Sequence, residues 1–184
     1  MNPPELSFWA LVREDFHTND ASLAHQGFWA IFVHRFGNWR MSVKPRFVRA
    51  PLSVIYQILN KLIQILCGIK LDYTVKVGRR VKLEHFGGMI LGARSIGNDV
   101  ILRQNTTLGT RSLDDLNAKP VIEDFVNIGA GAVIVGDIRI GENSIIGANS
   151  LVYKDVPQNS VVVGVPAQLV RQNPNRNLSP LRKP

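Results

Sequence analysis

The stretch VNIGAGAVIVGDIRIGENSIIGANSLV, residues 126–152, decides the fold, because an aliphatic residue recurs in it at every sixth position. A helix repeats every 3.6 residues and a strand every two, so neither element gives this pattern. The spacing continues on the N-terminal side with two interruptions. The full series is Leu71, Val77, Leu83, Ile90, Ile96, Leu102, Leu108, Ile122, Ile128, Ile134, Ile140, Ile146 and Val152.

A period of six describes a chain that turns a corner after every six residues. Three such strands close one triangular coil, and stacked coils place the aliphatic residues in one interior column. Glycine often follows the aliphatic residue directly, which suits tight corners because glycine tolerates positive φ. These glycines are Gly78, Gly97, Gly109, Gly129, Gly141 and Gly147. The sequence therefore predicts a mainly β solenoid.

The series breaks at two places. Between Leu83 and Ile90 the step is seven, so one inserted residue accompanies His85 and the pair Gly87-Gly88. Between Leu108 and Ile122 the step is fourteen, so eight extra residues within GTRSLDDLNAKP must leave the coil as a loop. Breaks in a regular solenoid are places where a functional site can be built.

The chain divides into three parts. Residues 1–67 read as a helical region, in which GFWAIFVHRFGNWR has apolar residues at helical spacing and Pro51 is expected to start the third helix. Residues 68–170 form the solenoid. Residues 171–184 are a tail that we expect to be disordered or extended.

Composition limits the classes of function. The single cysteine, Cys67, excludes an intrachain disulfide, and no secretory signal precedes the helices, so we expect a cytoplasmic protein. The net charge of +8 favours anionic partners, but the basic residues are scattered, which argues against nucleic acid.

Residues 51–69 are very apolar, yet their polar residues form one helical stripe. This segment is therefore expected to be amphipathic rather than transmembrane, buried against the protein or lying on the inner face of a membrane.

Four segments resemble a known family. VGRRVKLEHFGG (residues 77–88) is similar to the motif IGRG-x-x-LDHATG of hexapeptide-repeat acyltransferases, and IGNDVILRQNTTLGT (residues 96–110) is similar to IENDVSILQSVTLGG. Residues 126–170 follow the family's C-terminal coils, and residues 27–40 resemble its helical segment GF-x-A-x-x-x-HR-x-x-HW. Within this superfamily the likeness is greatest to serine acetyltransferases and to polysaccharide O-acetyltransferases of the colanic acid type. The resemblance implies a left-handed parallel β-helix, a known exception to right-handed crossovers.

The resemblance also implies a chemistry. His85 matches the family's catalytic histidine, a general base that takes the proton of an acceptor hydroxyl. An imidazole with a pKa near 6.5 suits that role near neutral pH. Acetyl-CoA is the implied co-substrate, and neither a metal nor a covalent enzyme intermediate is required. The other histidines, His17, His25 and His34, are interpreted as packing or surface residues.

Acetyl-CoA is expected in the groove between neighbouring subunits, as the resemblance implies. Small residues would line its pantetheine arm, Pro166 and Ala167 would flank the adenine end, and Lys154 and Arg171 are candidates for the phosphates. The small residues are Gly109, Thr110, Ala130 and Ala148. A role as plain coil corners is the alternative for these small residues.

Three departures from the family motifs concern the acceptor. Glu84 replaces the aspartate that helps to hold serine, and Lys119 replaces a second histidine. The carboxylate that pairs with the catalytic histidine falls on Lys70, so Asp72 or Glu84 is expected to orient His85 instead. Losing specific contacts to a small zwitterion weakens its recognition. These departures favour a sugar or glycan hydroxyl, free or lipid-linked, over free serine.

Three functions therefore remain open. The first is a sugar O-acetyltransferase, whose acceptor wall would be the loop carrying Arg111, Asp114, Asp115 and Asn117 beside Lys119. The second is a serine O-acetyltransferase, and the third is a non-catalytic hexapeptide scaffold. A homotrimer is expected because the family's site needs two subunits, and pairing of two trimers through the N-terminal helices is a further possibility.

Overall fold

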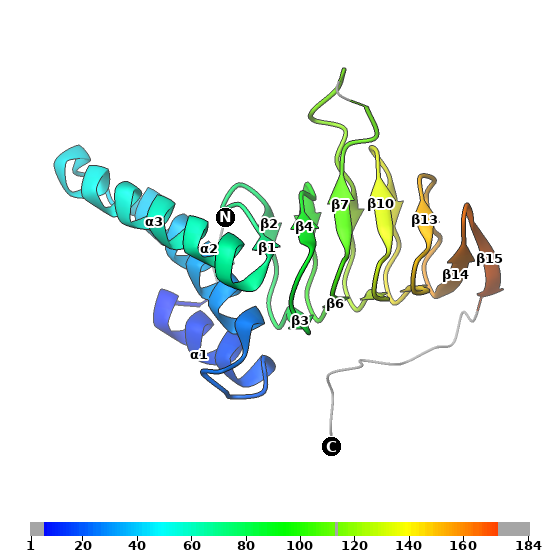
Figure 1. The fold of residues 1–184 in the computed structure, drawn as a ribbon, viewed down its shortest axis with the longest axis horizontal. Helices are drawn as coiled ribbons and strands as arrows, with labels where there is room; N and C mark the ends of the chain where they lie inside the picture. Colours follow the sequence, from blue (N-terminus) through cyan, green and yellow to red (C-terminus); the bar gives the residue numbers. More distant parts are fainter. Residues whose placement is uncertain (1–5, 113, 173–184) are drawn as a thin grey trace.

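The structure, a computed structural model, describes residues 6–112 and 114–172. Three helices come first: α1 (Phe8–Thr18), α2 (Gln26–Ser42) and α3 (Arg46–Cys67). They lie together at one end of a parallel β-helix, and the chain then advances coil by coil to the opposite end (Figure 1). The prediction of a mainly β solenoid preceded by a helical region is confirmed.

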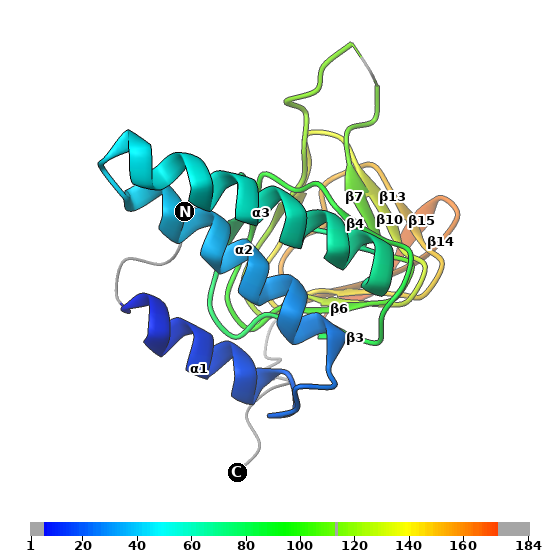
Figure 2. The ribbon, with the colours of Figure 1, turned by 60° about the vertical axis from the view of Figure 1, so that its left-hand side comes forward.

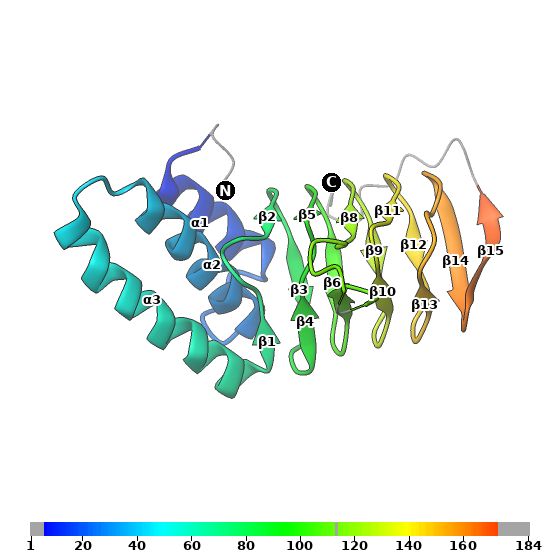
Figure 3. The ribbon, with the colours of Figure 1, turned by 90° about the horizontal axis from the view of Figure 1, so that it is seen from above.

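Three ladders of short strands form the sides of the β-helix, and Figure 3 shows successive coils stacked side by side. Every pairing inside the ladders is parallel except the last one, β14 with β15. The first ladder is β1 (Ile69–Lys70), β4 (Met89–Leu91), β7 (Thr107–Gly109), β10 (Val133–Val135) and β13 (Leu151–Val152). The second is β2 (Lys76–Val77), β5 (Ser95–Ile96), β8 (Val121–Ile122) and β11 (Arg139–Ile140). The third is β3 (Lys82–Glu84), β6 (Ile101–Arg103), β9 (Asn127–Ile128), β12 (Ile145–Ile146), β14 (Ser160–Gly164) and β15 (Ala167–Gln172).

The interior column contains the six-residue series with one correction. Ile90 is 49% exposed, whereas Leu91 is buried and pairs in register with Leu108. Met89, one residue before Ile90, is buried as well. The step from Leu83 to Leu91, which pairs with Leu108, is therefore eight rather than seven, and the step from Leu91 to Ile96 is five. Because side chains alternate along a strand, a shift of one residue turns Ile90 outward and Leu91 inward.

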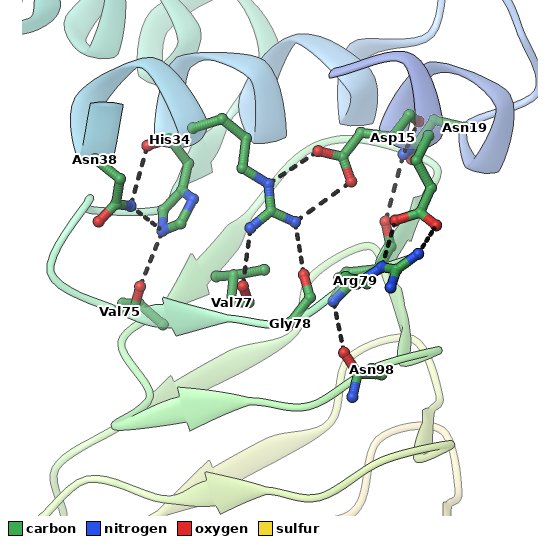
Figure 4. A network of polar contacts seen from close by, with 12 residues as sticks. Asp15, Asn19, His34, Asn38, Val75, Val77, Gly78, Arg79 and Asn98 are labelled. Atoms are coloured by element: carbon green, nitrogen blue, oxygen red, sulfur yellow. Dashed lines mark hydrogen bonds and ion pairs between the residues drawn. The ribbon is translucent and has the colours of Figure 1, made fainter. Parts of the chain in front are cut away.

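A buried polar network attaches the helices to the first coil (Figure 4). Arg35 of α2 donates from Nε to Asp15 of α1 at 2.9 Å, and from its Nη atoms to the carbonyls of Val77 and Gly78 at 2.8 and 2.6 Å. Both side chains are almost fully buried, and burial raises the pKa of the Asp15 carboxyl although Arg35 opposes the shift. One guanidinium thus bridges two helices and the solenoid.

His34, one residue before Arg35, makes a second attachment. Its Nε2 lies 2.9 Å from the carbonyl oxygen of Val75, and the ring is completely buried. Burial lowers its pKa to about 3, with Arg35 as a smaller cause. The interpretation of His34 as a packing residue agrees with this position. His17 is exposed at the end of α1.

The third helix differs from expectation in where it begins. It starts at Arg46, and Pro51 lies inside it rather than at its first position. A proline in a helix leaves the carbonyl four residues earlier without its partner. Here that residue is Phe47, in the highly exposed first turn, where water can take the bond. α3 is also the one helix among residues 6–112 and 114–172 that is long and apolar enough to cross a membrane, judged by length and composition alone.

The β structure ends two residues beyond the expected boundary at residue 170. β15 extends the third ladder to Gln172 by pairing antiparallel with β14, and Val161 faces Arg171. The β structure therefore runs into the segment expected to be a disordered or extended tail. Residues 173–184, the rest of that tail, lie outside the described part of the chain.

Candidate functional site

His85 lies at the corner where β3 ends and the inserted residues begin. Its φ is +61°, in the left-handed region that few non-glycine residues adopt. The ring is exposed, and within the described residues no hydrogen bond to its side chain is present. The corner thus presents an imidazole to solvent without committing its nitrogen atoms to the fold.

The two glycines that follow the His85 corner have different causes. Gly88 has a φ of +64°, and a Cβ atom there would lie 2.3 Å from Oδ1 of Asn105. The carbonyl of Gly87 accepts a hydrogen bond from the Asn105 amide at 3.0 Å. Gly88 is therefore required because Asn105 packs against it, whereas Gly87, with a φ of +103°, is required by its backbone conformation.

Glu84, the residue before His85, is paired with the neighbouring coil. Its carboxylate lies 3.0 Å from Nε of Arg103 and 3.8 Å from Nζ of Lys82. Glu84 and Arg103 face each other in the β3–β6 register. The Arg103 guanidinium also donates to Oδ1 of Asn127, one coil further. Glu84 is thus held by two cations, and no bond from it to His85 occurs among the described residues.

The other expected partner of His85 is Asp72, which follows β1. It is half-buried, and its backbone carbonyl accepts a hydrogen bond from the amide of Val75 at 3.1 Å. No hydrogen bond joins the Asp72 carboxylate to His85 in the described part of the chain. Lys70, where the family motif has a carboxylate, is exposed. Among the described residues of one chain, no carboxylate is therefore in contact with His85 to orient it.

A second histidine approaches this corner from the helical region. His25 precedes α2, and its Nε2 lies 3.4 Å from Asp20, which also pairs with Lys82 at 2.7 Å. Burial lowers the pKa of His25, and the charges of Lys82 and His85 lower it further. Its Nδ1 atom is buried, and residues 6–112 and 114–172 provide no hydrogen-bond partner for it. His25 is thus an electrostatic neighbour of His85, which its sequence position did not reveal.

The loop between β7 and β8 leaves the coil as expected (Figure 1). Its base is closed by Arg111, whose guanidinium stacks 4.9 Å from the ring centroid of Tyr153 on a later coil. Arg111, Asp115 and Tyr153 contribute to the lining of one open hollow of about 420 Å³. The loop therefore forms a wall beside the first ladder.

The remaining loop residues mainly support the loop itself. Asp114 accepts a hydrogen bond from Ser112 Oγ at 2.7 Å, and the amide of Asn117 donates to Asp115 at 2.9 Å. The amide of Lys119 donates to the carbonyl of Asn117 at 2.8 Å. Asp114 and Asn117 are exposed, whereas Lys119 is half-buried at the point where the chain rejoins the coil.

The small residues expected to line a cofactor differ in their packing. A Cβ atom added to Gly109 would meet nothing within 4 Å, so packing does not require glycine there. Ala130 and Ala148 occupy corners of successive coils, and the Asn149 amide donates to the Ala130 carbonyl at 2.8 Å. Thr110 is half-buried directly after β7.

The residues expected at the far end of the cofactor come together near the last coil. Lys154, Pro166 and Ala167 line one surface hollow of about 150 Å³ between β13 and the β14–β15 pair. Arg171 is exposed on β15. Among the described residues, no group of three or more histidine, cysteine, aspartate or glutamate side chains could hold a metal ion.

Comparison with known proteins agrees with this geometry. Residues 119–154 match the family model described as bacterial transferase hexapeptide (six repeats). A serine acetyltransferase of Bacillus subtilis is 32% identical over 178 residues, covering 90% of this chain and 79% of the relative. This chain belongs to the serine acetyltransferase family.

Two further relatives define how far the likeness extends. A serine acetyltransferase of Mycobacterium tuberculosis is 34% identical over 150 residues, which cover 81% of this chain. This chain spans only 62% of that protein's length. The solved structure of serine acetyltransferase from Brucella abortus in complex with coenzyme A superposes with a TM-score of 0.73 and 27% identity, covering 89% of this chain and 68% of that one.

The comparisons confirm some of the expectations from sequence and do not support others. The hexapeptide-repeat family and the β-helix are confirmed. The preference for a sugar acceptor over serine is not supported, because the matched relatives are named serine acetyltransferases. The serine alternative therefore fits these relatives better. The roles of the individual site residues stay predictions.

Proposed function

We propose that this protein is an acetyl-CoA-dependent O-acetyltransferase with His85 as its general base. The observation that carries the proposal is the exposed, uncommitted imidazole at the one corner whose motif matches the family's catalytic histidine. His85 takes the proton of the acceptor hydroxyl, and the hydroxyl oxygen attacks the thioester carbon. The carbon–sulfur bond then breaks, and the CoA thiolate takes the proton from the imidazolium. The acetyl group moves directly from sulfur to oxygen.

Acetyl-CoA is proposed to lie along the first ladder toward the last coil. The open side of Gly109 leaves backbone groups accessible to a pantetheine arm. The hollow of Lys154, Pro166 and Ala167 supplies a cation and small surfaces for the nucleotide end. A structural neighbour in complex with coenzyme A supports the choice of acetyl-CoA as co-substrate. Orientation of the two substrates, rather than covalent catalysis, supplies the rest of the rate enhancement.

L-Serine is the first acceptor that we propose. The support comes from the relatives, which are named serine acetyltransferases and match the chain from the helical region into the solenoid. In this proposal the acceptor lies between the His85 corner and a neighbouring subunit. Arg103 and Lys82 are the cations beside the corner, and both are paired with Glu84.

A sugar hydroxyl is the second candidate, and one contact favours it. Glu84 stands where the family has a serine-holding aspartate, and its carboxylate is engaged by Arg103 and Lys82. Lys119 adds a positive charge where the family has its second histidine, which would repel the ammonium of an amino acid. The polar loop beside this position suits a hydroxyl-rich ligand.

A thiol-release assay distinguishes the two acceptors. The purified full chain is given acetyl-CoA with L-serine or with a panel of sugars and nucleotide sugars, and free CoA thiol is followed. A kcat/KM for L-serine at least about tenfold above that of every sugar assigns the serine reaction. The reverse order assigns the sugar reaction. If no acceptor accelerates thiol release above the rate without acceptor, the enzymatic proposal is wrong and the scaffold alternative stands.

A further inference from the structure

The third helix presents its apolar side to solvent instead of to the protein. Phe47, Ile58 and Ile65 are 81%, 56% and 66% exposed. They are eleven and seven residues apart, close to three and two helical turns, so they lie along one side of α3. Val54, Leu62 and Leu66 extend the same surface. Together these six residues define the apolar face of α3.

The opposite side of α3 is the one that contacts the protein. Tyr56 and Cys67 are its buried residues, again eleven positions apart. The Arg40 guanidinium lies 4.4 Å from the ring centroid of Tyr56 and 4.5 Å from that of Tyr73. Figures 2 and 3 show α3 along the outer edge of the helical region, with α2 on one side of it. The described part of the chain therefore holds the helix in place and leaves its apolar face exposed.

The charges around this face have one sign. No acidic residue occurs between Asp20 and Asp72, whereas seven lysines and arginines do. Four of them are exposed on or next to α3: Lys44, Arg46, Lys61 and Lys70. Two copies of this face packed on each other would bring like charges together with no carboxylate from the segment to pair with them. A partner with an apolar interior and an anionic surface has the complementary chemistry.

We propose that α3 docks this protein on an anionic lipid bilayer. The helix lies in the plane of the surface, with Ile58 and its neighbours among the acyl chains and Lys61 at the phosphate level. It does not cross the bilayer, because Tyr56 and Cys67 pack on the protein and Lys61 is charged in its middle. This inference does not depend on the proposed reaction.

Flotation with vesicles tests the docking. The full chain is mixed with vesicles of phosphatidylcholine alone, or with phosphatidylglycerol at about one lipid in three. We expect the protein to float with the anionic vesicles and at least about tenfold less with the neutral ones. Raising the salt to about 0.5 M should weaken the binding, because exposed charges are screened.

Three variants locate the contact. Ile58→Glu combined with Leu62→Glu should lower the bound fraction at least about tenfold, since both side chains would enter the acyl region. Lys61→Glu should weaken binding about tenfold, and Arg13→Glu on α1, the same charge change at another exposed site, should weaken it much less. Circular dichroism and the elution volume check that each variant is folded.

Three outcomes would overturn the inference. The first is failure of the unmodified chain to float with anionic vesicles at low salt, and the second is flotation unchanged by the Ile58/Leu62 pair of substitutions. The third is dissociation of an oligomer by that pair of substitutions in the absence of vesicles, which would assign the face to another copy of this chain.

Discussion

The carboxylate of Glu84 lies 3.0 Å from Nε of Arg103, one coil further along the same ladder. Their side chains are 26% and 33% exposed, so the pair is a surface contact of small energetic weight, about 0–1 kcal/mol. Its importance is positional. The contact holds the Glu84 carboxylate, next to His85, against Arg103, where the shorter side chain of an aspartate would not extend as far.

Glu84→Asp therefore tests what this contact does to the acceptor. The shorter carboxylate should withdraw from Arg103 and restore the residue of the family motif. We expect kcat/KM for L-serine to rise about tenfold, the effect of one methylene in a specific site. Glu123→Asp, which shortens a carboxylate paired with Arg139, is the matched control. Equal values for Glu84→Asp and the unmodified protein with every acceptor would mean that Glu84 does not contact the acceptor.

The buried Asp15–Arg35 pair should dominate the attachment of the helices. Asp15→Asn leaves the Arg35 guanidinium buried without its counter-charge, which should lower the free energy of unfolding by about 3–5 kcal/mol. Asp137→Asn removes the partner of Arg94 in an exposed pair and should cost less than about 1 kcal/mol. Urea denaturation of both variants measures the two values. Similar losses would show that the network does not hold the helices.

The stability of the fold should decrease between pH 6.5 and pH 3 because His34 is buried. Its pKa is lowered from 6.5 to about 3, so the unfolded chain binds a proton in this window and the folded chain does not. The unfolding free energy then falls by up to about 1.4 kcal/mol per pH unit as the pH decreases. His25, whose pKa is also lowered, adds a contribution of the same sign.

A variant isolates the part due to His34. Glutamine at this position keeps an N–H group for the Val75 carbonyl without a titratable ring. His34→Gln should flatten the stability profile between pH 7 and pH 5, measured by denaturation at each pH. A slope as steep as that of the unmodified chain would assign the effect to other groups.

Some features of this fold are predicted by the sequence, and others are not. The six-residue period alone identifies the interior column from Ile96 to Val152 and the loop before Val121. It wrongly places Ile90 in the interior. The step from Leu83 to Leu91 is two residues longer than six and the step from Leu91 to Ile96 is one shorter, so the two together differ from the regular period by only one residue. It also places Pro51 at a helix start, since proline is favoured there, although the exposed first turns tolerate it further inside.

The candidate site is predicted in part. His85 and the loop come from the breaks in the period and from the motifs. Arg103 could have been found by counting one coil forward from Glu84, since residues one coil apart share a ladder position. The position of His25 near His85 could not have been found from the sequence, because it depends on how α2 docks on the coil. That docking uses the bonds from Arg35 to the carbonyls of Val77 and Gly78. No local pattern indicates the burial of Arg35 or of Asp15, its partner on α1.

The assembly is proposed to be a homotrimer. A closed ring with threefold symmetry would place the flat side of one β-helix beside the next and complete the His85 corner from a second subunit. Light scattering of the purified protein should give three chains of 20.5 kDa, or six if trimers pair through their helices. A monomer at the concentration used for activity would contradict this arrangement.

The rate of CoA release by His85→Ala tests the assignment of the general base. We expect kcat to fall about 10²–10⁴-fold with the best acceptor. The oligomer and the melting temperature should not change, because the side chain is exposed and makes no hydrogen bond to the described residues. His17→Ala, an exposed histidine away from the corner, should keep the normal rate. A His85→Ala protein that retains near-normal turnover would contradict the assignment of His85 as the general base.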